Sequence, residues 1–167
     1  MDKNEKIEAY ELLNLQLKGL LSAQNYTISN LSNAAALLWA TLPHQVFTGF
    51  YLFNGKKLIL GPFQGSVSCV EIALGKGVCG EVAKTSIPMI VENVKNHKNY
   101  ISCDSKAMSE LVLPLLKDGK IVGVLDLDSS DIGYYDAIDQ GYLTEFAQIL
   151  CEMTDFEFFK VEAKNEG

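Results

Sequence analysis

Three of the four cysteines in this sequence lie within one stretch of the chain and could act together as thiols. Nine residues separate Cys69 from Cys79, and twenty-three separate Cys79 from Cys103, so none of the three forms a C-x-x-C pair. The chain has 167 residues, 48% of them hydrophobic, and a chain of this size can bury a full core without disulfide staples. In a reducing compartment, such cysteines are working thiols, metal ligands or buried fillers rather than structural bridges.

The spacing disfavours a metal centre. Structural zinc sites normally use paired ligands two to four residues apart, and neither His44 nor His97 forms such a pair with a cysteine. We therefore expect no bound metal, and the three cysteines remain candidates for working thiols or for fillers of the core.

The local context separates Cys103 from the other cysteines. It lies in "YISCDS", within a polar segment of irregular pattern, and an exposed thiol with polar neighbours is a candidate nucleophile. Cys69 and Cys79 border the glycine-rich stretches "GPFQGSVSC" and "GKGVCG", which allow close backbone approach, and they are candidate resolving thiols. Taken alone, Cys69 inside a predicted strand and Cys151 on the apolar side of a predicted helix would be buried fillers, and Cys151 keeps that interpretation.

Two carboxylates share one face of a predicted strand downstream of Cys103. Because successive side chains of a strand point to opposite sides, "IVGVLDLD" places Asp126 and Asp128 on the face of Val122, with Ile121 and Leu127 on the other face. The pair either contributes to a site or simply ends a strand at the solvent edge, and its own pattern favours neither.

Glu110 joins these acids in one of the two registers that the preceding turn allows. A two-residue loop at Asp118-Gly119 would pair Glu110 with Leu127, whereas a three-residue loop with a left-handed Gly119 would pair Glu110 with Asp126. Asp-Gly suits both turns, so the sequence leaves the register open. If the three acids gather, their mutual repulsion raises at least one pKa and suits the cluster to binding an ammonium group or donating a proton.

The elements that must position these residues begin with two helices. Apolar residues recur at helical spacing over residues 5–23, which predicts an amphipathic helix. The Ala- and Leu-rich segment 29–42 predicts a second helix, which Pro43 ends.

Strands and a closing helix follow. Asn54-Gly55 and Asp118-Gly119 each lie between two apolar runs, which predicts two hairpins. A further strand, "SVSCVEIAL", precedes a short helix, "VCGEVAKTS", and the segment from Tyr135 to about Phe159 predicts a long final helix. This order is typical of a single α+β domain with an antiparallel sheet and helices on its faces.

The net charge of -7 and the pI of about 4.8 exclude several kinds of partner. No basic stripe is available to neutralise phosphates, so neither nucleic acid nor a membrane is expected. No segment approaches the ~20 apolar residues that a membrane span needs, and we expect a cytoplasmic protein that binds a small molecule or another protein.

Several motifs occur in a fixed order over roughly residues 45–150 and together resemble one family. They are "FTGFY", "GPFQG", a cysteine four residues later, "GKGVCG", "CDS", "KDGKIVGVLDLDS" and "YYDAID". In this combination the sequence resembles the free methionine-(R)-sulfoxide reductases, whose members have the GAF fold. The resemblance implies one GAF domain over residues 1–167, with the N-terminal helices in 1–43 and the sheet, active-site loops and closing helix in 45–159.

The GAF fold implies a central antiparallel sheet of about six strands. The N- and C-terminal helices are then expected on one side of the sheet, and an active-site helix and loop on the other. The resemblance leaves open whether the N-terminal helix packs within one chain or across a homodimer.

The resemblance also implies roles for single residues. Cys103 matches the attacking thiol, which reduces free L-methionine-(R)-sulfoxide and is left as a sulfenic acid. Cys69 matches the resolving thiol that forms a disulfide with it, and Cys79 matches a third or alternative resolving thiol. Thioredoxin would then reduce the disulfide, and no bound cofactor is implied.

The remaining matched residues belong to the substrate pocket. Glu110, Asp126 and Asp128 match the acids that hold the polar groups of the substrate and assist protonation of the sulfoxide oxygen. Tyr51 matches an aromatic wall for the S-methyl group, and Phe47 stands where the family usually has tryptophan. Two other functions stay open beside the reductase: a GAF-type sensor that binds a small ligand without chemistry, and a thiol-redox switch.

Overall fold

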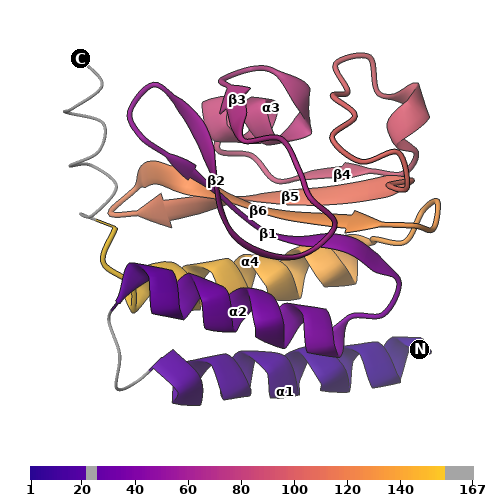
Figure 1. The fold of residues 1–167 in the computed structure, drawn as a ribbon. Coiled ribbons are helices and arrows are strands. Elements are labelled where there is room, and N and C mark those ends of the chain that lie inside the picture. The colour runs from indigo at the N-terminus through magenta and orange to yellow at the C-terminus, as the bar shows by residue number, and fades with distance from the viewer. Residues whose placement is uncertain (22–25, 157–167) are drawn as a thin grey trace.

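The described part of the chain comprises residues 1–21 and 26–156 of a computed structural model. Its elements follow the order predicted from the sequence, with two helices first, then strands interrupted by a short helix, and a closing helix (Figure 1). They are α1 (Lys3–Leu21), α2 (Thr27–Thr41), β1 (Gln45–Phe53), β2 (Lys57–Gly65), β3 (Glu71–Ala73), α3 (Gly77–Thr85), β4 (Met89–Val91), the 3-10 turn η1 (Val94–Asn96), β5 (Ser109–Lys117), β6 (Lys120–Ser129) and α4 (Ala137–Glu152).

All six strands form one antiparallel sheet with the order β3-β2-β1-β6-β5-β4. Figure 1 shows α1, α2 and α4 on one side of this sheet, while α3 and the loop before β5 lie on the other. Helix α1 packs on α4 and α2 of its own chain. The predicted α+β class and the two-sided arrangement of the GAF fold are both confirmed.

Each face of the sheet has its own core because the strands alternate. Leu125 and Leu127 of β6 point to the three-helix side, where they join the larger apolar cluster. Val124 of β6 and Val112 of β5 point to the α3 side, where they contact a smaller cluster. The smaller cluster lies between the sheet and α3, next to the polar residues on this side of the sheet.

The β5–β6 hairpin has neither of the two predicted registers. Asp118 and Gly119 both have positive φ, 52° and 74°, and form a two-residue turn that pairs Lys117 with Lys120. A bulge at Val122 then shifts the pairing, so Glu110 lies opposite Asp128. The three acids nevertheless share one face, because Asp126 and Asp128 are two residues apart.

The same bulge reverses the faces predicted for the start of β6. Ile121 packs against the cluster on the α3 side, and Val122 packs against the cluster on the helix side. The prediction for these two residues was wrong because the extra residue breaks the alternation, which is regular from Gly123 onward.

Two further boundaries differ from the prediction. The segment "SVSCVEIAL" is a strand only at Glu71–Ala73, so Cys69 lies in the loop between β2 and β3. Helix α4 ends at Glu152, where Asn30 of α2 donates from Nδ2 to Met153 O at 3.2 Å. The parts of the first and last predicted helices at residues 22–23 and 157–159 lie outside the described residues. Within residues 1–21 and 26–156, none of the helices combines the length and apolar character of a membrane span.

Candidate active site

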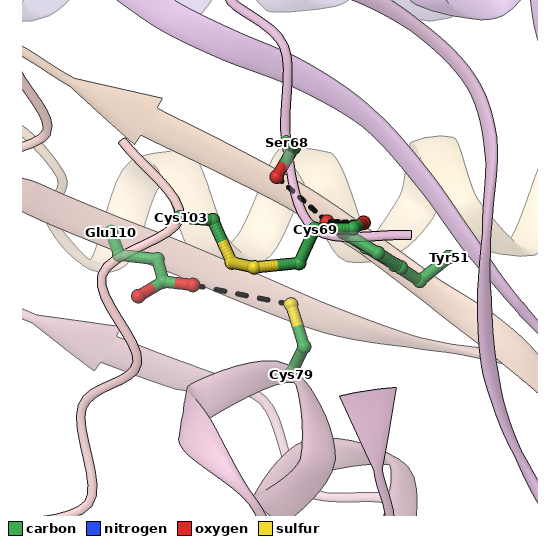
Figure 2. The surroundings of a disulfide bond; sticks show 6 residues. All are labelled: Tyr51, Ser68, Cys69, Cys79, Cys103 and Glu110. Atoms are coloured by element: carbon green, nitrogen blue, oxygen red, sulfur yellow. Dashed lines mark hydrogen bonds between the residues drawn. A yellow bond between two sulfur atoms is a disulfide. The ribbon is translucent and has the colours of Figure 1, made fainter. Parts of the chain in front are cut away.

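A disulfide joins Cys69 to Cys103, two residues that lie 34 positions apart in the sequence (Figure 2). Their Cα atoms are 5.4 Å apart, and both residues are half-buried. Cys103 comes from the loop between η1 and β5, as predicted, but it is not the exposed free thiol that its polar neighbours suggested. The disulfide shows that the β2–β3 loop and the loop before β5 converge on the α3 side of the sheet.

Cys79 lies close to this disulfide on the first turn of α3 and is a free, buried thiol. Figure 2 shows its side chain pointing from α3 toward the sheet. The glycine at position 80 permits this placement, because a Cβ there would lie 2.5 Å from Ala73 O. Helix α3 can therefore start directly on the turn after β3, with Gly75 N donating to Gly80 O at 2.8 Å. Cys151, in contrast, is buried on the helix side, as expected for a filler.

The acid cluster, which consists of Glu110, Asp126 and Asp128, faces Cys79 from the sheet. Glu110 and Asp126 are each only 5% exposed, and Asp128 is half-buried. The Cys79 thiol lies 4.0 Å from Glu110 Oε1 (Figure 2). One ligand atom each from Cys79, Glu110 and Asp126 lie within 4.8 Å of one another, so these three are the described residues that could hold a metal ion. The absence of a metal stays a prediction.

Burial and mutual repulsion raise the pKa values of this cluster. Burial raises the pKa of Glu110 well above its usual value, and the charges of Asp126 and Asp128 raise it further. The pKa of Asp126 rises to about 6 through burial, and hydrogen bonding to Glu110 and Cys79 limits the increase. Burial, followed by the charge of Asp126, raises the pKa of Asp128 as well. At neutral pH the cluster therefore retains protons that isolated carboxylates would lose.

The Cys79 thiol is affected in the same direction. Burial raises its pKa well above the usual value, and the neighbouring charges of Asp126 and Glu110 add to this effect. Cys79 is consequently a protonated thiol at neutral pH.

Two carboxylate oxygens of the cluster are buried without a hydrogen-bond partner among the described residues. They are Glu110 Oε2 and Asp126 Oδ1. Burying a polar atom without a partner costs free energy, so such atoms indicate a position where a donor is received. An ammonium group or a protonated oxygen has the required chemistry.

Aromatic residues form the other wall of the cavity. Phe47 and Tyr51 are both 1% exposed and line it, and the Phe47 ring stacks on Phe63 with centroids 5.2 Å apart. With the disulfide formed, the cavity has a volume of about 30 Å³, which is room for a water molecule or two.

The structure also places residues at the cavity that the sequence reasoning missed. Ser68, Tyr100 and Asp104 line it, together with Cys79, Cys103 and the acid cluster. Ser68 and Asp104 are direct sequence neighbours of Cys69 and Cys103, and this is the signal that could have identified them, since neighbours of a converging loop residue reach the same cavity; Tyr100, three residues before Cys103, carries no such signal.

Comparisons with known proteins agree on one family. The GAF domain family matches residues 33–150. Free methionine-R-sulfoxide reductase of Saccharomyces cerevisiae is 39% identical over 153 residues, which cover 87% of this chain and 85% of the yeast protein.

Two solved structures are similar over most of both chains. That of fRMsr of Staphylococcus aureus in its reduced form has 40% sequence identity and a TM-score of 0.84, and the match covers 86% of this chain and 94% of that chain. That of free methionine-R-sulfoxide reductase from Neisseria meningitidis, in complex with its substrate, has 35% identity and a TM-score of 0.86. It covers 95% of this chain and 93% of that chain.

Proposed function

Because this chain belongs to the free methionine-R-sulfoxide reductase family of GAF-domain proteins, we propose that it reduces free L-methionine-(R)-sulfoxide to L-methionine with Cys103 as the attacking thiol. The observation that carries the proposal is the Cys69–Cys103 disulfide beside a buried acid cluster that keeps protons at neutral pH. A reductase of this kind needs a thiol pair and an acid in one cavity, and a purely ligand-binding domain needs neither.

The first step transfers oxygen from the substrate to Cys103. The Cys103 sulfur forms a bond to the sulfoxide sulfur as a carboxylic acid of the cluster protonates the sulfoxide oxygen. The oxygen then moves to Cys103 as this S–S bond and the original S–O bond break, which leaves methionine and a Cys103 sulfenic acid. The substrate sulfur gains two electrons and Cys103 loses two; the acid supplies the proton of the S–OH group, and the thiol proton replaces it on the acid. A sulfoxide oxygen leaves poorly unless it is protonated, so a carboxylic acid of raised pKa, such as Glu110 or Asp126, lowers the barrier.

The second step closes the disulfide. The Cys69 thiol attacks the sulfur of the Cys103 sulfenic acid, the S–O bond breaks, and the oxygen leaves as water. This reaction protects Cys103 from further oxidation, because a sulfenic acid that no thiol reaches proceeds to irreversible acids. Cys79 is proposed as a third or alternative resolving thiol, although its burial and raised pKa make it the weaker nucleophile.

Thioredoxin then restores the thiols by disulfide exchange, in which its own dithiol is oxidised. Half-burial of Cys69 and Cys103 supports this step, because the attacking thiolate must reach one sulfur of the pair. No bound cofactor enters the cycle.

The substrate is proposed to bind between the two walls of the cavity in the reduced protein, where the loops that carry Cys69 and Cys103 are no longer joined and can move apart to make room for it. The unpartnered oxygens Glu110 Oε2 and Asp126 Oδ1 would receive its ammonium group or its protonated sulfoxide oxygen. Phe47 and Tyr51 would contact its S-methyl group, and phenylalanine at position 47 keeps the apolar surface that this contact needs.

Incubation with free methionine sulfoxide and dithiothreitol, with methionine as the measured product, tests the proposal. Wild-type protein should turn over, and Cys103→Ser should form no methionine. Turnover that survives in Cys103→Ser would refute the role of this cysteine. Absence of turnover in the wild type would favour a ligand sensor or a thiol-redox switch instead.

Cys69→Ser separates the two steps. This variant should release about one methionine per chain and then stop when thioredoxin is the reductant, because the first step does not use Cys69. Continuous cycling with thioredoxin at the wild-type rate would refute the resolving role.

A further inference from the structure

We infer that the hydroxyl group of Tyr51 is a positioning device for the resolving thiol, holding the Cys69 segment so that its sulfur reaches the sulfenic acid on Cys103. The inference rests on the proposed function and adds to it: the tyrosine ring serves the methyl pocket, and the hydroxyl serves the second step. Tyr51 is thus a positioning residue for disulfide closure.

The hydroxyl group is fixed by a rigid part of the sheet. Tyr51 lies in the middle of β1, between β2 and β6, opposite Leu60 on one side and Val124 on the other. Its ring is buried, and its centroid lies 6.2 Å from that of Phe47. Position and packing together leave the phenol oxygen little freedom.

Two hydrogen bonds connect this oxygen to the Cys69 segment (Figure 2). Tyr51 Oη donates to the backbone oxygen of Cys69 at 2.9 Å, and it lies 2.7 Å from Ser68 Oγ. A phenol has one hydrogen, which is directed at Cys69, so Ser68 must donate to Tyr51. Burial raises the pKa of Tyr51, which keeps this donor protonated at any physiological pH.

The segment needs such a tether because its apolar side chains do not anchor it. Val67 is 83% exposed and Val70 is 66% exposed, so both point to solvent on either side of Ser68 and Cys69. Backbone bonds fix the two ends, where Ser66 N donates to Val46 O and Leu60 N donates to Val70 O, each at 2.9 Å. The Tyr51 hydroxyl holds the middle, where the resolving thiol lies.

Neither hydrogen bond involves a sulfur atom, so reduction of the disulfide leaves both donors and both acceptors intact. The tether is therefore available in the step that needs it, when Cys69 must find the sulfenic acid before another reagent does. Loss of the hydroxyl should slow closure without removing any reacting group.

The test measures how the sulfenic acid partitions between Cys69 and dimedone, a diketone that traps sulfenic acids. Reduced protein receives one equivalent of methionine sulfoxide with a fixed dimedone concentration and no reductant, and mass spectrometry quantifies the Cys103 adduct and the disulfide. The ratio is set after methionine has left, so a change in substrate binding does not affect it. Tyr51→Phe keeps the ring and should raise the adduct-to-disulfide ratio about tenfold, because it removes both hydrogen bonds of the tether.

Three variants calibrate this result. Cys69→Ser should give mainly the adduct, since only the weaker nucleophile Cys79 then competes with dimedone. Ser68→Ala keeps the bond to the Cys69 carbonyl and should raise the ratio less than Tyr51→Phe. Tyr135→Phe removes a buried hydroxyl group that donates to Gln45 Oε1 at 2.7 Å, on the helix side of the sheet, and it should leave the ratio at the wild-type value.

A parallel experiment with hydrogen peroxide separates this inference from the proposed function. Peroxide oxidises a reactive thiol to a sulfenic acid directly, so the partition can be measured even if methionine sulfoxide gives no methionine. A wild-type ratio in Tyr51→Phe with either oxidant would overturn the tether. An equal rise in Tyr135→Phe would overturn it too, because it would assign the effect to a general loosening of the fold.

Discussion

Asp139 and the acid cluster are buried on opposite faces of the sheet, and they differ in the number of hydrogen-bond donors that contact them. Asp139 on the helix side is fully buried, and Tyr10 and Lys6 of α1 both donate to it. Its Oδ2 also accepts from the backbone of Asp136, which completes the capping box of α4. These contacts cap α4 and join its start to α1, so this carboxylate contributes to the fold.

The acid cluster on the α3 side is almost as deeply buried but has far fewer donors. Glu110 and Asp126 face each other and a protonated thiol, and each has one buried oxygen without a partner. No described lysine forms a salt bridge with any of the three acids of the cluster. The comparison teaches that a buried carboxyl with hydrogen-bond donors holds elements together, whereas one without donors costs stability, and under the proposed function this cost is kept because the carboxyl binds the substrate.

The largest expected effect is a loss of stability when Asp139, the carboxylate that accepts several hydrogen bonds, is replaced. Asp139→Ala should lower the free energy of unfolding by about 3–5 kcal/mol, because it leaves the buried Tyr10 hydroxyl without its acceptor, leaves Lys6 with only the exposed Asp136, and removes the capping box of α4. Urea denaturation measures the change. Asp131→Ala is the matched control, because that aspartate forms an exposed pair with His44, and its loss should cost less than about 1 kcal/mol. Equal stability of the two variants would show that Asp139 stabilises the fold no more than an exposed aspartate does.

The next effect is on activity. Glu110→Gln keeps the shape of the side chain but cannot protonate the sulfoxide oxygen, so kcat/KM for methionine sulfoxide should fall about 100-fold. Its free energy of unfolding at pH 7 should equal or exceed that of the wild type, since a buried group of raised pKa is replaced by a neutral amide. Steady-state kinetics and urea denaturation of the same samples give both values. A variant that keeps its activity and loses stability would show that Glu110, like Asp139, stabilises the fold and does not take part in the reaction.

The sequence predicts much of this architecture because the relevant patterns are local. Helical spacing of apolar residues identified α1, and Asp118-Gly119 identified the second hairpin, since this dipeptide tolerates the positive φ that a tight turn requires. The register was not predictable, because the bulge falls on Val122, a residue that favours strands and leaves no sign of an irregularity. The shared face of Asp126 and Asp128 was predictable all the same, because the bulge lies before both.

The site was predictable only as a set of candidates. Spacing and context indicated three thiols and three acids, and the resemblance to one family paired them. The convergence of the Cys69 and Cys103 loops depends on contacts between segments far apart in the sequence, which no local pattern encodes. The hydrogen bond from Tyr51 to the Cys69 carbonyl was equally unpredictable, because every residue has a backbone oxygen and the sequence does not show which one a side chain contacts.

The smallest expected effect concerns the pH dependence of stability and tests the comparison most directly. The pKa of Asp126 is about 6 in the folded protein, compared with about 3.8 for an exposed aspartate, so between these values the folded state binds more protons than the unfolded state. Stability must then fall as the pH rises from about 4 to about 6, by an amount on the order of 2 kcal/mol. Asp126→Asn removes this titration, so it should gain stability over the wild type across that range and keep the gain above it. Urea denaturation at pH 4, 5, 6 and 7 measures the difference, and a difference that stays constant or shrinks with rising pH would show that Asp126 is satisfied after all.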